Sequence, residues 1–246
     1  WQQYLRYLWN LLQFDLGPSL KFRTQTVNDI IGRSLPVSAQ LGVMSIALAV
    51  VMGIPMGILA ALYRNTPVDY GATFTAIFLR SVPNIVLGPV MILVFALKLG
   101  WLPVARWESP AHWVLPTFTL GTAYAAGIAR LTRGSLLEVM GEDYIRTARA
   151  KGLREMVVVG RHALKNALIP VVTYLGPVLA AVVTGTFVVE TIFGIPGLGR
   201  HFVESVGNRD YPLVMGTALV YALLLVSANL LVDITYAWLD PRIRYE

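Results

Sequence analysis

The sequence contains no cysteine and few charged residues. The absence of cysteine excludes disulfide bonds, thiolate metal sites and cysteine nucleophiles. Only 14% of the residues are Asp, Glu, Lys or Arg, whereas a soluble globular domain carries about 25%. Hydrophobic residues make up 56% of the chain, so the composition indicates a membrane protein rather than a soluble domain with a large core.

Two further classes of site find no support in the sequence. The three histidines, His112, His162 and His201, are far apart and lack the spacing of metal ligands. A phosphate-binding loop needs Gly-Lys-Ser/Thr after a glycine-rich turn, and none of the four lysines follows a glycine. We therefore expect no metal site in this chain, and we expect any ATP hydrolysis to come from a partner.

Long apolar runs dominate the rest of the sequence. A membrane-spanning helix needs about 20 mainly apolar residues, and five runs qualify, with Arg80 as their only charged residue. The runs are Leu41–Leu62, Gly71–Leu97, Ala111–Ala129, Ala167–Val189 and Tyr211–Val232. Small residues within them would let helices approach closely; these include Gly53, Gly57, Gly121, Ala125 and Gly185. The sequence thus predicts an all-α membrane protein, a polytopic bundle with five transmembrane helices.

The orientation of the bundle follows from the basic residues in its loops, which are more frequent on the cytoplasmic side. One side carries eleven Lys and Arg, eight of them between the third and fourth runs, and the other side carries seven. We therefore place the segment 131–166 and the C-terminus in the cytoplasm. The segments 1–33 and 191–212 then lie outside, the transmembrane domain covers 34–237, and 238–246 forms a cytoplasmic tail.

The first twelve residues have the pattern of an amphipathic helix. Aromatic and leucine side chains fall at helical spacing on one face: Trp1, Tyr4, Leu5, Leu8, Trp9 and Leu12. This pattern predicts either a helix at the membrane surface or an ordinary amphipathic helix packed on protein. A chain that begins outside and ends inside has an odd number of spans, so we expect a sixth helix upstream of residue 1.

The longest polar segment contains a short helix with its own start and stop signals. Glu142 and Asp143 open it, while basic residues close it, which complements the helix dipole. Glu142 and Arg146 are spaced as an i,i+4 ion pair, and Gly152 suits a left-handed C-terminal cap. A solvated connector explains such charges equally well. The end signals instead favour a docking helix for a soluble partner.

The sequence GEDYIRTARAKGL, followed by RHALKNALIPVV, resembles the cytoplasmic signature of permease subunits in peptide ABC importers. The general importer pattern begins with Glu-Ala-Ala, where this chain has Arg146-Thr147-Ala148, and it places its proline earlier than Pro170. Both departures are typical of the oligopeptide and dipeptide branch. DLGPS, PVSAQLG, ETIFGIPGLG, NRDYP and DPRIRY agree with this family, so the resemblance covers nearly the whole chain.

The resemblance implies a type I ABC importer permease in the bacterial inner membrane. Its partners would be a second permease subunit, two cytoplasmic ATPase subunits, a peptide-binding protein and membrane lipid, with no nucleic acid. The chain would be no enzyme and would hold no cofactor, because ATP and magnesium would bind to the ATPases. The polar helix would be the coupling helix; its residues are Glu142, Asp143, Tyr144, Arg146, Thr147, Ala148, Arg149, Ala150, Lys151 and Gly152.

Two further groups are candidate contacts. In the outer loop the resemblance places contacts with the binding protein at Pro196, Gly197, Arg200, Arg209 and Asp210, although a plain turn would explain the same residues. Charged and polar residues within apolar runs are often functional, which suggests a substrate path. Its candidates are Arg80, Asn84, Tyr124, Glu190 and Asn229. Arg80 could instead extend to the cytoplasmic headgroups.

Three other functions compete with peptide import. An ion-coupled carrier needs ionisable groups near the membrane midplane, and no acidic residue lies in the middle of any run. The same importer fold could carry another cargo, such as a nickel chelate or glutathione. A purely structural membrane subunit would not need the coupling signature.

Overall fold

The structure is a computed structural model that describes residues 1–184 and 186–239. These residues form helices, with one isolated β-bridge between Pro18 and Thr26. The longer helices are α1 Gln2–Leu12, α2 Val27–Leu62, α3 Pro67–Ser81, α5 Pro110–Val139, α9 Ile169–Thr184, α11 Leu198–Asn208 and α12 Tyr211–Leu239. The shorter ones are α4 Asn84–Met91, η1 Ile92–Lys98, α6 Asp143–Ala150, α7 Glu155–Val157, η2 Val158–Ala163, α8 Leu164–Ala167 and α10 Phe187–Ile192. The predicted all-α fold is confirmed.

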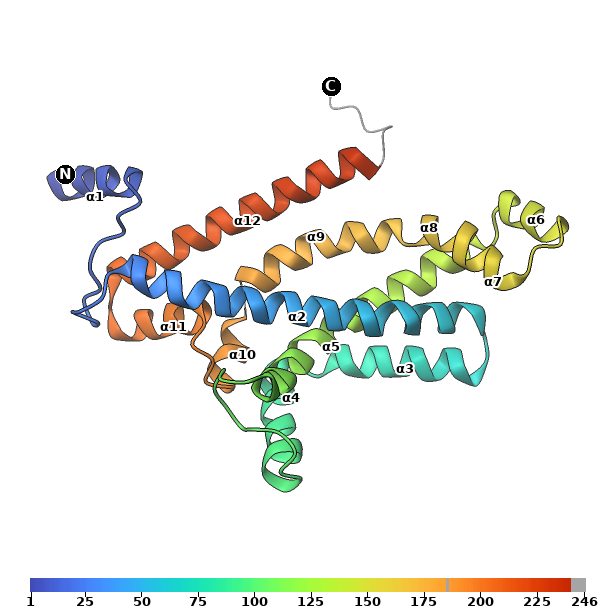
Figure 1. The fold of residues 1–246 in the computed structure, drawn as a ribbon, viewed down its shortest axis with the longest axis horizontal. Helices are drawn as coiled ribbons and strands as arrows, with labels where there is room; N and C mark the ends of the chain where they lie inside the picture. The colour runs from blue at the N-terminus through green and yellow to red at the C-terminus, as the bar shows by residue number, and fades with distance from the viewer. Residues whose placement is uncertain (185, 240–246) are drawn as a thin grey trace.

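The long helix α2 runs along the middle of the molecule (Figure 1). It begins with a capping box, in which Asp29 N–H donates to the Thr26 hydroxyl and Thr26 N–H donates to the Asp29 carboxylate. Its 36 residues correspond to about 54 Å of helix. The helix therefore begins at Val27, well before the first predicted run and before the predicted domain boundary at residue 34.

The helix pair α2 and α5 makes the most extensive packing interface. A Cβ atom at Gly53 would lie 2.7 Å from the carbonyl oxygen of Ala125, and one at Gly57 would lie 2.5 Å from that of Ala129. At Gly121 it would lie 2.8 Å from the carbonyl oxygen of Ser45. Only glycine permits this approach, so the prediction that small residues let the helices approach closely is confirmed at these three positions. Gly185, which was part of the same prediction, lies outside the described residues.

The second predicted run is not one straight helix. The axes of α3 and of the α4–η1 segment differ by 100°. Proline restricts the residue before it to extended conformations, and Val82, which precedes Pro83, has φ −85° and ψ 114°. The chain thus bends sharply at Pro83, and the α4–η1 segment leaves the direction of α3 (Figure 1).

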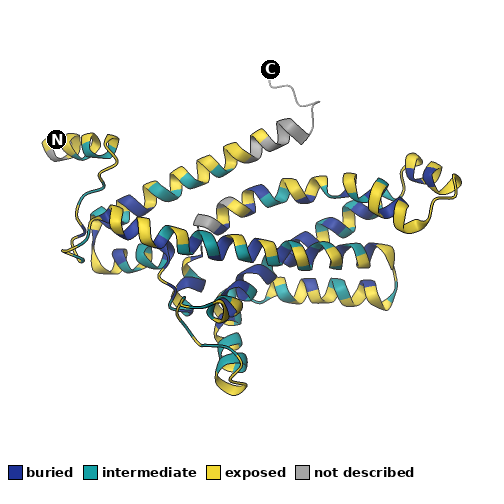
Figure 2. Cartoon of the chain, in the orientation of Figure 1, coloured by how far each residue is buried: buried dark blue, intermediate teal, exposed yellow. Residues whose placement is uncertain are grey.

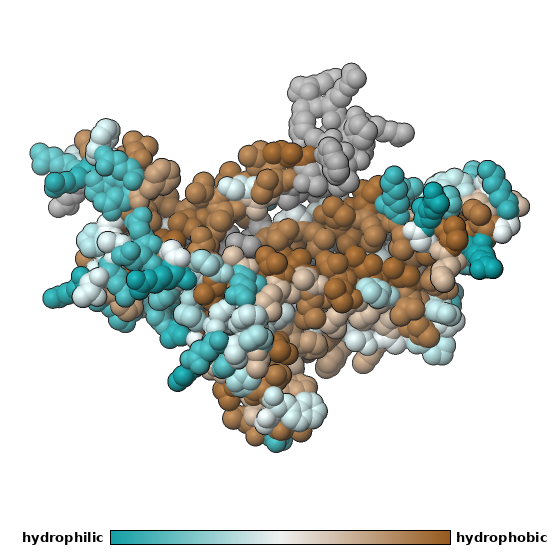
Figure 3. All heavy atoms as spheres, in the orientation of Figure 1, coloured by the Kyte–Doolittle hydropathy of each residue, from teal (hydrophilic) through white to brown (hydrophobic). Residues whose placement is uncertain are grey.

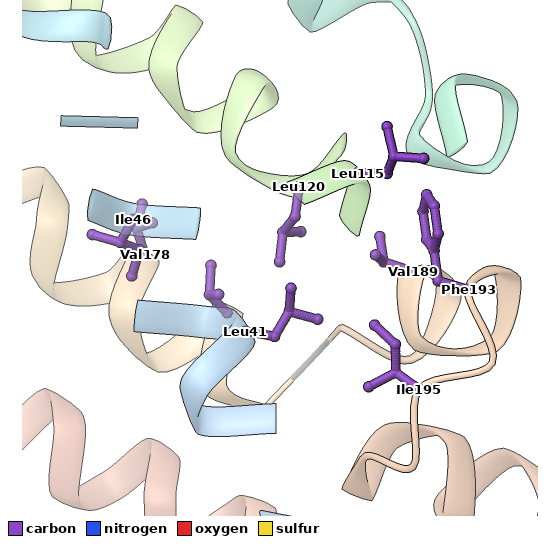
Figure 4. Packing of buried hydrophobic residues seen from close by; sticks show 9 residues of the cluster. Leu41, Ile46, Leu115, Leu120, Val178, Val189, Phe193 and Ile195 are labelled. Carbon is purple, nitrogen blue, oxygen red and sulfur yellow. The ribbon is translucent and has the colours of Figure 1, made fainter. Parts of the chain in front are cut away.

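The largest buried cluster joins α2, α5, α9 and α10 (Figure 4). Leu41 and Leu115 come from the long helices, while Phe193 and Ile195 come from the chain after α10. All four are at most 2% exposed. The cluster fixes the short α10 segment against the bundle.

The two ends of the long axis are polar, and hydrophobic side chains cover the surface between them (Figure 3). Among the described residues, α2 and α12 are each long and apolar enough to cross a membrane, and the bent α3–α4–η1 segment would be a third span. α9 contributes a shorter apolar segment at Ile169–Leu179. The total of five spans stays a prediction.

The amphipathic α1 lies apart from the helical bundle (Figure 1). Its apolar face is open, with Trp1 96% and Leu12 75% exposed, and Figure 2 shows this helix as largely exposed. The predicted helix is confirmed. Its placement at the membrane surface stays a prediction.

Candidate functional site

The short helix α6 stands at one end of the molecule, beyond α5 and α8 (Figure 1). Glu142 is its N-cap residue in an extended conformation, so the helix itself begins at Asp143. Its eight residues correspond to about 12 Å of helix. The predicted short helix in the polar loop is confirmed.

Two apolar side chains attach α6 to the bundle. Ile145 is fully buried and Ala148 is 6% exposed. They pack in one cluster with Leu136, Val158 and Ala163, which belong to α5 and η2. Sequence reasoning missed Ile145, although an isoleucine three residues before an alanine is a sign of a buried helix face. Ala148 lies in the predicted helix, but its side chain contacts its own chain and faces the bundle rather than solvent.

The charged residues of α6 form local pairs. Arg146 lies 3.5 Å from Asp143, so the expected pairing with Glu142 is not the one observed. Arg149 donates to both carboxylate oxygens of Glu155, at 2.7 and 3.2 Å. These hydrogen bonds lower the pKa of Glu155 and raise the pKa of Arg149. Arg149 therefore connects the end of α6 to the start of α7.

The remaining predicted residues either close the helix or face outward. Gly152 has φ +76°, which confirms the predicted left-handed C-terminal cap of the helix. The hydroxyl of Tyr144, another residue of the predicted coupling helix, accepts a hydrogen bond of 2.8 Å from the Asn166 amide. Exposed side chains form the outward face of the helix, which we define as Asp143, Arg146, Thr147, Ala150 and Lys151.

At the opposite end, Glu190 organises the outer loop. It is fully buried and accepts hydrogen bonds from the hydroxyl groups of Ser38, at 2.7 Å, and Thr186. Its second oxygen accepts from the backbone N–H of Arg200 at 3.0 Å. The carboxyl group thereby joins α2, α10 and α11. With all these partners inside its own chain, Glu190 does not line an open path, contrary to the prediction.

The predicted contacts for a binding protein divide into buried and exposed residues. Gly197 packs directly on the Glu190 carboxyl group, which leaves no room for a side chain. Asp210 is also fully buried and accepts hydrogen bonds from the Ser19 hydroxyl and from the N–H groups of Leu20 and Lys21. Burial acts to raise the pKa of Asp210, but these hydrogen bonds lower it overall. For these two residues, direct contact with a partner was wrongly predicted.

The other outer residues remain accessible. Pro196 and Arg209 are exposed. Arg200 is half-buried and forms an ion pair of 2.7 Å with Glu204. The buried Glu190 and Asp210 therefore hold the loop in place from inside the protein, while Pro196 and Arg209 lie on its surface.

The structure does not bring the five predicted path residues together. Asn84 is half-buried at the start of α4, Tyr124 is half-buried between α5 and α9, and Asn229 is exposed on α12. Only Arg80, of these five, lines the cavity between α2, α3 and α5, together with Arg130 and Arg133. Sequence reasoning missed this group because no local pattern connects α3 with α5.

The comparisons with known proteins agree with this geometry. Residues 53–245 match the family described as binding-protein-dependent transport system inner membrane component. The chain is 48% identical to the dipeptide transport system permease protein DppB of Bacillus subtilis over 242 residues, which cover 98% of this chain and 79% of that protein. It is 44% identical to the oligopeptide transport system permease protein OppB of Escherichia coli K12, covering 99% of this chain and 80% of that protein.

A solved structure supports the fold. The inward-facing MetNI methionine ABC transporter matches with a TM-score of 0.71 at 21% identity, covering 86% of this chain and 96% of that chain. The match to the family model extends over most of the sequence. The chain therefore belongs to the family of inner membrane components of binding-protein-dependent transport systems.

Proposed function

We propose that this chain is the permease subunit of an ATP-driven importer that carries oligopeptides or dipeptides into the cytoplasm. Relatives named as dipeptide and oligopeptide transport permeases, with 48% and 44% identity over nearly the full chain, support the cargo class. The same relationship favours peptides over nickel chelates, glutathione or an ion-coupled mechanism.

The outward face of α6 is the observation that carries the mechanism. Ile145 and Ala148 hold the helix against the bundle through the cluster with Leu136, Val158 and Ala163, which we call the apolar seat. The polar face of the helix stays free for a partner. A helix anchored on one side transmits a push or pull on the other side to α5 and η2, which hold it. We infer that α6 docks on a cytoplasmic ATPase subunit and transmits its movement to the membrane helices.

The complete importer would contain a second permease subunit, two ATPase subunits and a peptide-binding protein. We infer that the binding protein contacts the outer loop at Pro196 and Arg209. Glu190 and Asp210 would keep this surface in a fixed position, since each accepts hydrogen bonds from several segments.

The test uses the full complex in proteoliposomes and a labelled oligopeptide. ATP is inside the vesicles, on the side of the ATPase subunits. Ala150 is exposed on the outward face, so Ala150→Trp blocks docking without disturbing the core, whereas Ala150→Ser preserves the surface. We expect Ala150→Trp to abolish both uptake and peptide-stimulated ATP hydrolysis and Ala150→Ser to keep both. Uptake that persists in Ala150→Trp, or that follows a proton gradient without ATP, would contradict the proposal.

A further inference from the structure

The cavity between α2, α3 and α5 has the size of a small-ligand site. Its volume is about 540 Å³, within the range of about 300–1,000 Å³ that is typical of such pockets. Alanines from all three helices, including Ala60, Ala76 and Ala129, line its walls. Because these side chains end at Cβ, the helices leave space between them.

Three arginines line this otherwise mainly apolar cavity, and among the residues that the structure describes only one of them has an acidic partner. Arg133 forms two hydrogen bonds with the buried Asp69, from Nε at 2.6 Å and from Nη2 at 2.7 Å. Arg80 and Arg130 also line the cavity. Within the described ranges, no carboxylate lies within 4.0 Å of either guanidinium group. The cavity therefore offers two positive charges to an incoming anion.

The depth of Arg80 favours a solute over a lipid headgroup. Asp69 lies in the first turn of α3, and Arg80 lies about 16 Å further along this helix, next to the bend. The hydrocarbon core of a bilayer is about 30 Å thick, and headgroups lie outside it. A charged side chain at such depth is costly unless it faces a cavity or a partner. An anion that enters the cavity would supply the missing partner.

We propose that this cavity binds the terminal α-carboxylate of the transported peptide through Arg80 and Arg130. The inference rests on the proposed peptide cargo and deepens it. Guanidinium groups form strong charge-assisted hydrogen bonds with carboxylates, and Met56 and Ile77 provide apolar contacts beside them. Every unmodified peptide carries this carboxylate whatever its sequence. A site for it would therefore hold many different peptides in one orientation.

The experiment compares uptake of one peptide with a free C-terminal carboxylate and the same peptide with a C-terminal amide. Both are offered to the reconstituted complex with its binding protein, and the binding protein's affinity for each is measured separately. Arg80→Gln and Arg130→Gln remove a charge, Arg80→Lys keeps it, and Arg64→Gln is the matched control. Arg64 is exposed in the turn between α2 and α3 and does not line the cavity.

We expect Arg80→Gln or Arg130→Gln to lower uptake of the acid about tenfold, as for the loss of one charged hydrogen bond, and to leave the amide unchanged. The acid-to-amide ratio, corrected for the binding protein, should fall toward one. Arg80→Lys should retain part of the preference, and Arg64→Gln should match the wild type. Thermal unfolding of each purified variant checks that it is folded.

Three results would overturn the inference and are distinguishable. If the wild type imports neither peptide, the proposed peptide cargo fails and the carboxylate site fails with it. If the wild type imports peptide and both glutamine variants import the acid and the amide as the wild type does, only the carboxylate site fails. If the variants lose acid and amide equally, the arginines serve the structure or bind a lipid phosphate, and the carboxylate site again fails.

Discussion

The two polar ends of this permease are built in opposite ways. At the α6 end, charged side chains lie outside and apolar side chains, Ile145 and Ala148, attach the helix to the bundle. At the α10–α11 end, the acidic side chains of Glu190 and Asp210 are fully buried and hold the loop by hydrogen bonds. Both segments are rich in polar residues in the sequence, yet polarity marks the surface at one end and the interior at the other.

This difference bears on how each end could work. An apolar seat is tolerant of small shifts, because dispersion contacts have little directionality. A buried carboxyl group with several donors requires one arrangement, since an unpaired donor in the interior is costly. We therefore expect the α6 end to adjust as the partner moves, and the outer loop to move as one unit with α2.

The largest effect should follow the removal of the buried acid at the outer end. Glu190→Ala leaves the hydroxyl groups of Ser38 and Thr186 and the N–H of Arg200 without their acceptor. We expect a loss of about 3 kcal/mol in the free energy of unfolding, visible as a lower unfolding temperature in detergent. Glu204→Gln, which removes only a half-exposed ion pair, is the control. Equal unfolding temperatures for the two variants would show that the Glu190 carboxyl group does not hold the outer loop.

Ile145→Ala tests the apolar seat at the cytoplasmic end. The side chain is fully buried in a small cluster, so its truncation should cost about 2 kcal/mol locally. We expect faster hydrogen exchange across 143–153 and reduced peptide-stimulated ATP hydrolysis in the full complex. Tyr144→Phe removes only the hydrogen bond to Asn166 and should change the hydrogen exchange of this segment little. Unchanged exchange in Ile145→Ala would show that the seat does not hold α6.

The comparison also shows what the sequence could and could not predict. Start and stop signals are local, so the position of α6 and the left-handed Gly152 followed from the residues themselves. Close packing at Gly53 and Gly57 followed from the small residues in apolar runs. The family resemblance, through its long motifs, indicated the fold that the structure shows.

Burial depends on contacts between distant segments, and the sequence carried no signal for them. Asp210 meets Ser19, which lies near the other end of the chain, and Glu190 meets Ser38 on α2. An acidic residue in a loop is therefore predicted to be exposed until the segment that covers it is known. The same reason explains why the burial of Ala148 was not predicted and why the arginines around the cavity were not grouped.

A smaller effect should follow a change at the end of α6. Gly152 has φ +76°, where a side chain costs about 1 kcal/mol. Gly152→Ala should lower the unfolding free energy by this amount, and Gly152→Asn should lower it less, because asparagine tolerates this conformation. Gly207 is a matched control, since it lies in α11 at a negative φ with open space around it. If Gly152→Ala were as stable as Gly207→Ala, the left-handed C-terminal cap would not constrain the loop.

The smallest expected effect is the loss of stability at low pH through one carboxyl group at each end of the molecule. The pKa values of Glu155 and Asp210 are both lowered in the folded protein, so each ionised form stabilises the fold. This stabilisation is complete above the ordinary carboxyl pKa of about 4 and is lost as pH falls through the lowered values. Arg149→Gln removes the partner of Glu155. Because the pair is exposed, we expect this change to lower the free energy of unfolding by less than about 1 kcal/mol at neutral pH. Asp210→Asn should remove more of the acid dependence, because its carboxylate is buried and accepts hydrogen bonds from Ser19, Leu20 and Lys21. Unfolding temperatures measured from pH 7 to pH 3 would show the reverse order if the exposed pair were the stronger one.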